Sequence, residues 1–195
     1  HVTEGADIMY FLENDLRFQH CPFMFSEMED AVDRILAAKE ENEKVLIFGD
    51  RDVDGVSSTT ILYECLKDMG MDVQWRIPTG DQVYGLTKEA VDDFEKQGGT
   101  LIITVDCGIT SADEIDYAAD KCIDVIVTDH HNPGEGTPDC IILDPKMENS
   151  NYPFHDISGA AVAYKLVQAL RFAKTELYKE DICLLNVVPV NEAYT

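Results

Sequence analysis

The chain has 195 residues, 45% of them apolar and 27% charged, which is typical of a globular protein rather than a disordered or fibrous one. Its 38 acidic residues outnumber the 15 Lys and Arg, so the formal net charge is −23. No apolar run reaches the roughly 20 residues of a membrane helix. No Lys/Arg cluster forms a basic face, so a nucleic-acid partner would need positive charge from elsewhere than these side chains.

The six cysteines are widely and irregularly spaced, and none forms a CxxC pair. This pattern is not a disulfide framework, and several of the cysteines lie inside apolar stretches. With no signal peptide at the start of the chain, we expect reduced thiols in a cytoplasmic protein.

The predicted elements alternate along the chain. Residues 1–44 are expected to form a helical lead-in that packs on a sheet, with a capping box from Ser26 to Glu29 opening a helix to Glu41. A second capping box begins at Ser111. The remaining elements, in order, are strand 45–48, helix 56–69, strand 72–77, helix 87–97, strand 101–105, helix 111–121, strand 125–128, short strand 140–143 and helix 158–173.

The predicted strands are apolar throughout rather than alternating, which is typical of strands buried on both faces. Strands that alternate with helices form parallel sheets with helices on both faces. We therefore predict an α/β fold with a mostly parallel sheet, with residues 45–195 as its main domain.

Acidic and imidazole side chains follow three of the predicted strands. They are Asp50, Asp52 and Asp54 after the first strand, Asp106 after the third, and Asp129, His130 and His131 after the fourth. Because the carboxyl ends of parallel strands share one edge, these groups are expected to converge there. Clustered carboxylates repel one another, and bound divalent ions would offset that repulsion. Oxygen and imidazole ligands without thiolate suit Mn²⁺ or Mg²⁺, with Zn²⁺ or Fe²⁺ also possible.

Each of these acidic and imidazole motifs also has a purely structural explanation. A single Asp at a strand end is often a helix cap, and adjacent histidines are often incidental. An EF-hand loop starting at Asp50 requires Glu at its twelfth position, where this chain has Ile61. Ser57 and Ser58 are expected either to cap the following helix or to meet a phosphate at its N-terminus. The coincidence of three acidic motifs on three strand ends favours a metal site.

Three segments resemble the first motifs of the DHH phosphoesterase superfamily: Gly49-Asp50-Arg51-Asp52-Val53-Asp54-Gly55, Thr104-Val105-Asp106-Cys107-Gly108 and Val127-Thr128-Asp129-His130-His131. The narrower resemblance is to the N-terminal catalytic domain of RecJ-type exonucleases. It is carried by Tyr84-Gly85-Leu86, Asn132-Pro133-Gly134, Asp144-Pro145-Lys146, Tyr152-Pro153-Phe154 and the segment that starts at Ser158-Gly159.

The resemblance implies a DHH domain over residues 45–195 that holds two Mn²⁺ or Mg²⁺ ions and hydrolyses phosphodiesters. Asp50, Asp52 and Asp54 would bind the ions, Asp106 would bridge them, and His130 would be a ligand oriented by Asp129 or a neighbour. His131 would stabilise or protonate the reacting phosphate group. The implied activity is 5′-to-3′ degradation of single-stranded DNA in repair or recombination, with the strand gripped mainly by a C-terminal domain missing from this chain.

The chain departs from the family pattern at several positions. Arg51 replaces a more usual aromatic residue and is expected to contact phosphate, together with Ser57, Ser58, Ser158 and Gly159. Residues 79–83 lack a customary Arg. Asn186 occupies the position of a metal-binding Asp in the fourth motif, which would weaken the second ion.

Two alternatives remain open from the sequence. One is a phosphodiesterase acting on short oligonucleotides, cyclic dinucleotides or phosphoadenosine phosphates. The other is a non-catalytic DHH-like scaffold that binds nucleic acid.

Overall fold

The computed structural model describes residues 8, 12, 19–134 and 136–180. Its centre is a five-stranded sheet with strand order β2-β1-β3-β4-β5. The strands are β1 (Lys44–Gly49), β2 (Asp72–Arg76), β3 (Leu101–Val105), β4 (Asp124–Thr128) and β5 (Ile141–Leu143). All four strand pairs are parallel, so the carboxyl ends of the strands meet at one edge. The predicted α/β fold is confirmed.

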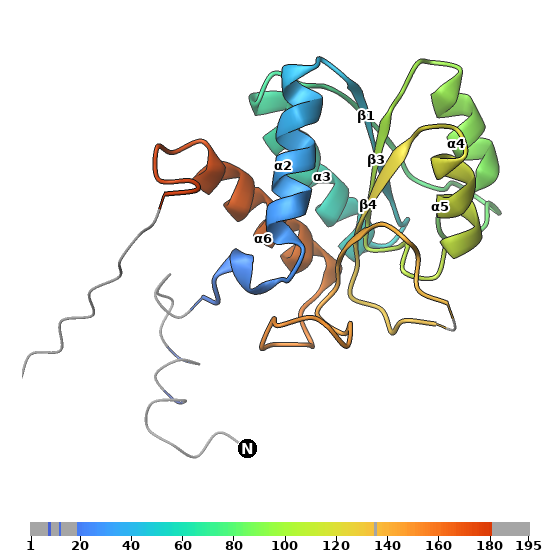
Figure 1. Cartoon of the computed structure of the whole chain (residues 1–195). Helices are drawn as coiled ribbons and strands as arrows, with labels where there is room; N and C mark the ends of the chain where they lie inside the picture. Colours follow the sequence, from blue (N-terminus) through green and yellow to red (C-terminus); the bar gives the residue numbers. More distant parts are fainter. Residues whose placement is uncertain (1–7, 9–11, 13–18, 135, 181–195) are drawn as a thin grey trace, which may run out of the picture.

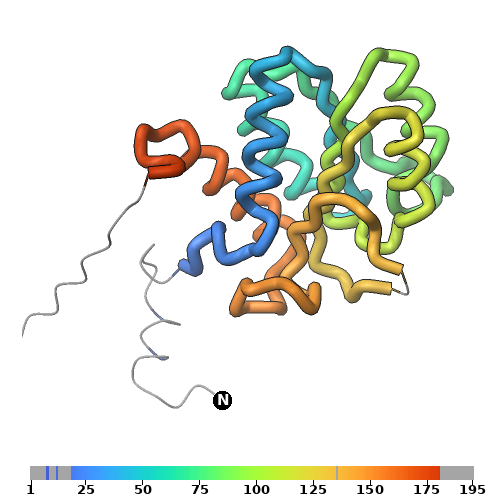
Figure 2. Tube along the Cα trace, viewed as in Figure 1, coloured from blue at the N-terminus to red at the C-terminus, as the bar shows by residue number. Residues whose placement is uncertain are grey.

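Helices cover both faces of the sheet (Figure 1). One face carries the short 3-10 helix η2 (Pro22–Met24), α2 (Met28–Glu40), α3 (Val53–Asp68) and α6 (Gly159–Ala173). The other face carries α4 (Lys88–Glu95) and α5 (Ala112–Ala119). Figure 2 shows the long connection from β5 to α6 at the same end of the molecule as the carboxyl ends of the strands. This connection brings the start of α6 to that edge.

The sheet separates two apolar cores. Along β1, Val45 and Ile47 pack into the core under α2, α3 and α6, whereas Leu46 and Phe48 pack into the core under α4 and α5. All five residues of β3 are buried. Because both faces of the central strands are covered, the residues that follow those strands start from a fixed backbone.

Helix α3 begins three residues earlier than predicted, at Val53 instead of Val56. The reason is Asp52, whose side chain accepts a hydrogen bond from the backbone N–H of Gly55 and caps the helix. As a result Asp54 lies in the first turn of α3 rather than in a loop.

The two predicted capping boxes are wrong in detail. Helix α2 begins at Met28 with Glu27 at its N-cap and no side-chain cap, and the Ser26 hydroxyl donates instead to the Asn149 carbonyl. Ser111 is the N-cap residue of α5, but its side chain accepts no capping hydrogen bond. Thr87 does cap α4, by accepting a hydrogen bond from the N–H of Ala90.

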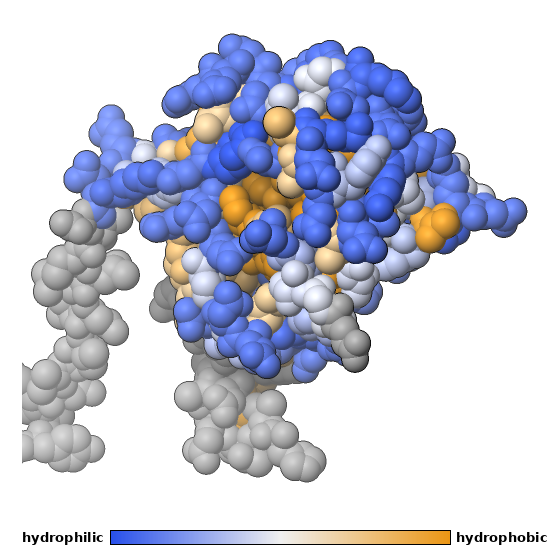
Figure 3. Space-filling model, turned by 45° about the vertical axis from the view of Figure 1, so that its right-hand side comes forward, coloured by the Kyte–Doolittle hydropathy of each residue, from blue (hydrophilic) through white to orange (hydrophobic). Residues whose placement is uncertain are grey.

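None of the described helices is long and apolar enough to cross a membrane. Most of the face seen in Figure 3 is polar, with apolar side chains gathered around a hollow. A hollow of about 270 Å³ lies between α2 and α5, lined by Ile115, Ile123 and Ile141 among others. It borders Asp124 and Val125 at the beginning of β4, so it is far along the strand from the edge that carries the acidic motifs.

Candidate metal centre

The first acidic motif joins β1 to α3. Asp50 follows β1 directly and is buried, and Asp52 caps α3. Both oxygens of Asp54 accept backbone hydrogen bonds from the start of α6, at 2.8 Å from Gly159 N and 2.7 Å from Ala160 N. Asp54 therefore ties the first turn of α3 to the first turn of α6 and contributes negative charge where the α6 dipole is positive.

Asp106 follows β3 and is almost completely buried. Its backbone lies in the left-handed region, with φ of 58°, and its N–H donates to the Thr128 carbonyl at 2.9 Å. The Oδ1 atom lies 3.1 Å from His130 Nε2. Gly159 packs directly against this carboxylate: a Cβ atom at residue 159 would stand 2.2 Å from Asp106 Oδ1. The start of α6 thus comes this close only because residue 159 is glycine.

The third motif places two imidazoles beside these carboxylates. His130 Nε2 is 3.7 Å from Asp54 Oδ2 in addition to its contact with Asp106. Asp129 is fully buried and accepts hydrogen bonds from the backbone N–H groups of His130, His131 and Ile109, and from His131 Nδ1 at 2.7 Å. Of the two residues expected to orient the ring of His130, Asp129 or a neighbour, Asp129 does not do so, because its carboxylate is bonded to the backbone N–H of His130 and to the ring of His131.

The crowding of carboxylates perturbs the acid–base chemistry of this edge. Burial, followed by the nearby charges of Asp54 and Asp52, raises the pKa of Asp106 to about 7. Burial alone would lower the pKa of His131, but the hydrogen bond and charge of Asp129 outweigh it and raise that pKa. In the absence of a cation, the raised pKa favours the protonated form of Asp106 at a pH where carboxylates are normally ionised.

The side chains fit a divalent cation. One atom each from Asp50, Asp52 and Asp106 lie within 4.8 Å of one another, and so do atoms of Asp106, His130 and His131. Asp106 belongs to both groups. Asp50 Oδ1 and Asp106 Oδ1 are buried and accept no hydrogen bond from the described residues, although Asp106 Oδ1 lies 3.1 Å from His130 Nε2; two donor atoms that face each other in this way fit a shared metal. Oxygen and imidazole donors without thiolate suit Mn²⁺ or Mg²⁺.

Other residues expected at the site have different contacts. Arg51 donates to the carbonyls of Gly80 and Gln82, at 2.8 and 3.1 Å. Ser58 is fully buried and donates to the carbonyl of Asp54 one turn back, so its expected phosphate contact is wrong. Ser57 lies beside it in α3 and is half-buried.

The remaining expectations concern α6 and the end of the chain. The Ser158 side chain caps α6 by accepting a hydrogen bond from Ala161 N at 3.3 Å. Asn186, and the apolar stretch around it, lies outside the described residues.

Two residues at this edge were not assigned a role from the sequence. The Tyr84 hydroxyl lies 3.3 Å from the Asp106 carbonyl and 3.3 Å from His131 Nδ1. Asp144 follows β5, is almost completely buried, and has its pKa raised to about 6 by that burial. Both occur in segments quoted above for the family resemblance, and Asp144 also directly follows a predicted strand, which is the signal that could have found it.

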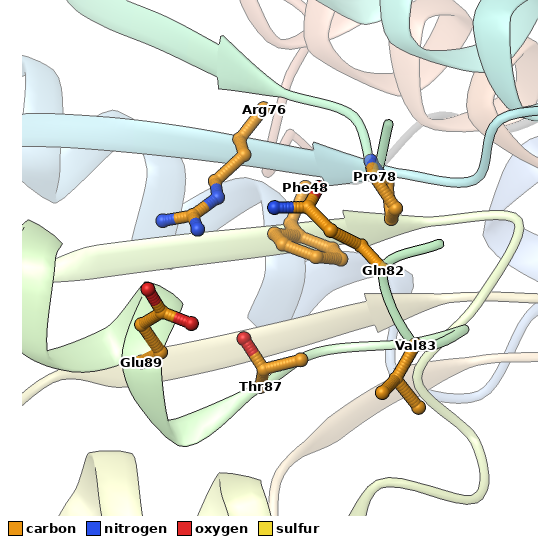
Figure 4. Close-up of a pocket in the computed structure, with 7 residues that line it drawn as sticks. All are labelled: Phe48, Arg76, Pro78, Gln82, Val83, Thr87 and Glu89. Atoms are coloured by element: carbon orange, nitrogen blue, oxygen red, sulfur yellow. The ribbon is translucent and has the colours of Figure 1, made fainter. Parts of the chain in front are cut away.

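A small pocket of about 140 Å³ lies next to this edge (Figure 4). Phe48 of β1 and Arg76 of β2 line it, together with Gln82 and Val83 from the β2–α4 loop. This loop also carries Tyr84, whose hydroxyl contacts Asp106, so one loop borders both the pocket and the candidate metal centre.

Comparison with known proteins places these features in context. The single-stranded-DNA-specific exonuclease RecJ of Bacillus subtilis is 40% identical over 151 residues, which is 76% of this chain and 19% of that protein. The corresponding exonuclease of Escherichia coli is 36% identical over 149 residues, 75% of this chain and 26% of that protein. The chain therefore spans only about a fifth to a quarter of the length of these relatives.

The three-dimensional structure is also similar to that of a RecJ exonuclease. A crystal structure of exonuclease RecJ bound to manganese superposes on 79% of this chain and 40% of that protein, with a TM-score of 0.69 and 30% sequence identity. The model of the DHH family, N-terminal domain, matches residues 44–187, which include all three acidic motifs. This protein chain belongs to the DHH family.

Proposed function

We propose that this chain is the catalytic domain of a metal-dependent phosphodiesterase, and that it degrades single-stranded DNA from the 5′ end as a RecJ-type exonuclease. The observation that carries the proposal is the pair of ligand groups sharing Asp106 at the carboxyl edge of the sheet. Its support is the similarity to exonucleases named for single-stranded DNA and to an exonuclease RecJ whose crystal structure contains manganese.

The residues that would hold two divalent ions are Asp50, Asp52, Asp106 and His130, with Asp54 next to His130. Mn²⁺ or Mg²⁺ bound there would polarise a phosphoryl oxygen and supply a hydroxide-like water at neutral pH. Asp106 reaches both ligand groups, and its burial gives it a single position. The acidic cluster would then be neutralised by its cofactor rather than by Lys or Arg.

His131 is the proposed proton donor to the leaving oxygen. Its Nδ1 is bonded to the buried carboxylate of Asp129, which leaves Nε2 as the nitrogen that can exchange a proton with substrate. Asp129 raises the pKa of this imidazole and favours its protonated form. Asp129 itself accepts four hydrogen bonds and is a positioning residue rather than a base.

The strand is proposed to be held mainly outside these 195 residues, by a substrate-binding C-terminal domain. A net charge of −23 opposes binding of a phosphate backbone, and the phosphates near the reaction would be held through metal. We assign the activity to the cytoplasm, with which the five free cysteines among the described residues are compatible.

The test is hydrolysis of single-stranded oligonucleotides labelled at either end, with Mn²⁺ titrated into the chelator-treated chain. A 5′ label should be released first as a mononucleotide, and a 3′ label should give a ladder. Asp106→Asn should lower the rate at least about 100-fold. The matched control is Asp68→Asn, at the exposed end of α3, which should retain the full rate. Absence of hydrolysis when Mn²⁺ is shown to be bound would refute the proposal.

A further inference from the structure

The Tyr84 side chain is held by its neighbours and is also partly exposed. Its hydroxyl is fixed, because it lies 3.3 Å from both the Asp106 carbonyl and His131 Nδ1. Its ring packs edge-on against the His131 ring, with centroids 6.0 Å apart and an interplanar angle of 82°. Nevertheless 44% of the residue remains exposed. The ring is thus held in one orientation while part of its surface faces solvent beside the candidate metal centre.

The loop that carries Tyr84 is itself held in place. Arg51 donates to the Gly80 and Gln82 carbonyls, which attaches this loop to the first acidic motif. Figure 4 shows Gln82 and Val83 on the loop beside the pocket that Phe48 lines. The guanidinium of Arg51 is used for these contacts, so the loop presents a fixed backbone at the edge of the centre.

Two of the side chains exposed near the acidic motifs are apolar, and the nearest exposed guanidinium, that of Arg51, is bonded to loop carbonyls. Val83, which precedes Tyr84, is 72% exposed, and Val53, which lies between Asp52 and Asp54, is 83% exposed. Exposed aliphatic and aromatic groups beside a site for phosphate suit the flat apolar faces of nucleobases. A strongly acidic chain gains most from this kind of contact, because stacking does not require a cation.

We propose that Tyr84 is a stacking platform for the unpaired base of the nucleotide whose phosphate lies at the candidate metal centre. This inference rests on the proposed function. Edge-on packing against the His131 ring holds the Tyr84 ring, with the hydroxyl contact to the Asp106 carbonyl added, so a base stacked on the ring is positioned relative to the reacting groups. A base that is paired in a duplex would have to break its pair and leave the stack before it could lie on the Tyr84 ring, whereas an unpaired base is free to do so. The tyrosine would therefore select single-stranded substrate at the reacting nucleotide.

The test is a thermodynamic cycle in which the Tyr84 ring is removed from the protein and one base is removed from the oligonucleotide, singly and together. The probes are two single-stranded oligonucleotides with phosphorothioate linkages that resist hydrolysis, identical except that one lacks the base of its first nucleotide. Binding of each is measured in Mn²⁺ by calorimetry or NMR titration. The proteins are the unaltered chain, Tyr84→Leu, which removes the ring, and Tyr84→Phe, which removes only the hydroxyl.

Tyr84→Leu should weaken binding of the intact oligonucleotide about 5- to 150-fold and change binding of the abasic one by less than about twofold. Tyr84→Phe should stay within about threefold of the unaltered chain on both probes, because the ring is retained. Equal weakening on both probes by Tyr84→Leu would overturn the inference, since the ring would then act only by supporting His131. Failure of the unaltered chain to bind the intact probe, or to prefer it, would also overturn it.

These outcomes separate the inference from the proposed function. Because the probes resist hydrolysis, the cycle measures contact between ring and base without any catalytic step. A chain that shows the coupling but hydrolyses no phosphodiester would refute the proposed activity and leave the stacking role standing.

Discussion

Replacement of Gly159 by alanine should damage the candidate metal centre from its side. A Cβ atom at this residue would lie 2.2 Å from Asp106 Oδ1, 2.7 Å from Cγ and 2.8 Å from Cβ. Real Cβ atoms essentially never come within 3.0 Å of such neighbours, so the two groups must separate by at least about 0.8 Å. Asp106 is buried at the end of a fully buried strand, so it has little room to retreat. Forced separations of this kind cost about 1–3 kcal/mol of stability.

The same displacement should reach the ligands. Moving α6 outward breaks the hydrogen bonds from Gly159 and Ala160 to Asp54, and moving Asp106 separates the two ligand groups. We expect Mn²⁺ affinity, measured by calorimetry, to fall at least about tenfold. The control is Gly134→Ala, where the new Cβ meets only Thr110 Cγ2 at an ordinary 3.6 Å. A Gly159→Ala chain with unchanged urea midpoint and Mn²⁺ affinity would refute this reasoning.

Three further predictions concern the metal-free chain. Its free energy of unfolding in urea should fall by up to about 4 kcal/mol as the pH rises from about 4 to about 7, because the folded-state pKa of Asp106 is raised from 3.8 to about 7. In Asp106→Asn this pH dependence should be flatter. Glu43→Gln should cost about 1–2 kcal/mol in urea unfolding at pH 7, because Glu43 is paired with Arg34 at 2.8 Å. The pKa of Glu43 is lowered by that pair, so this difference should disappear as the pH falls below about 4. Arg51→Ala should speed amide hydrogen exchange across residues 79–84 at least about tenfold, and unchanged exchange would show that Arg51 does not hold the loop.

Much of the fold follows from local sequence. Continuous apolar runs predicted β1, β3 and β4 within one or two residues, because strands buried on both faces leave no other pattern. The order of strands and helices then placed Asp50, Asp106 and His130 at one edge. Apolar periodicity does not reveal the start of α3, because Asp52 caps the helix and the first turn carries Asp54 instead of a run of apolar residues.

The finer arrangement of the site depends on contacts between distant segments. No local pattern indicates that Asp54 accepts hydrogen bonds from Gly159 and Ala160, which are more than 100 residues away in the sequence. The sequence also does not show which histidine ring Asp129 contacts. The directions of the His130 and His131 rings depend on the folded backbone, which pairs Asp129 with His131. Such details are set by packing of the β5–α6 connection on the sheet edge, and periodicity carries no information about that packing.

The backbone of Asp106 affects how a change at this position should be interpreted. With φ of 58°, the residue occupies a conformation that Gly, Asn and Asp tolerate and that other side chains adopt at a cost. An aspartate here is therefore favoured both by the turn that follows β3 and by the ligand cluster. Finding aspartate retained among relatives would not by itself separate these two selective pressures. Asparagine also tolerates this backbone conformation but lacks the negative charge. Among relatives, asparagine at this position would therefore mark proteins that keep the turn and have lost the metal ligand.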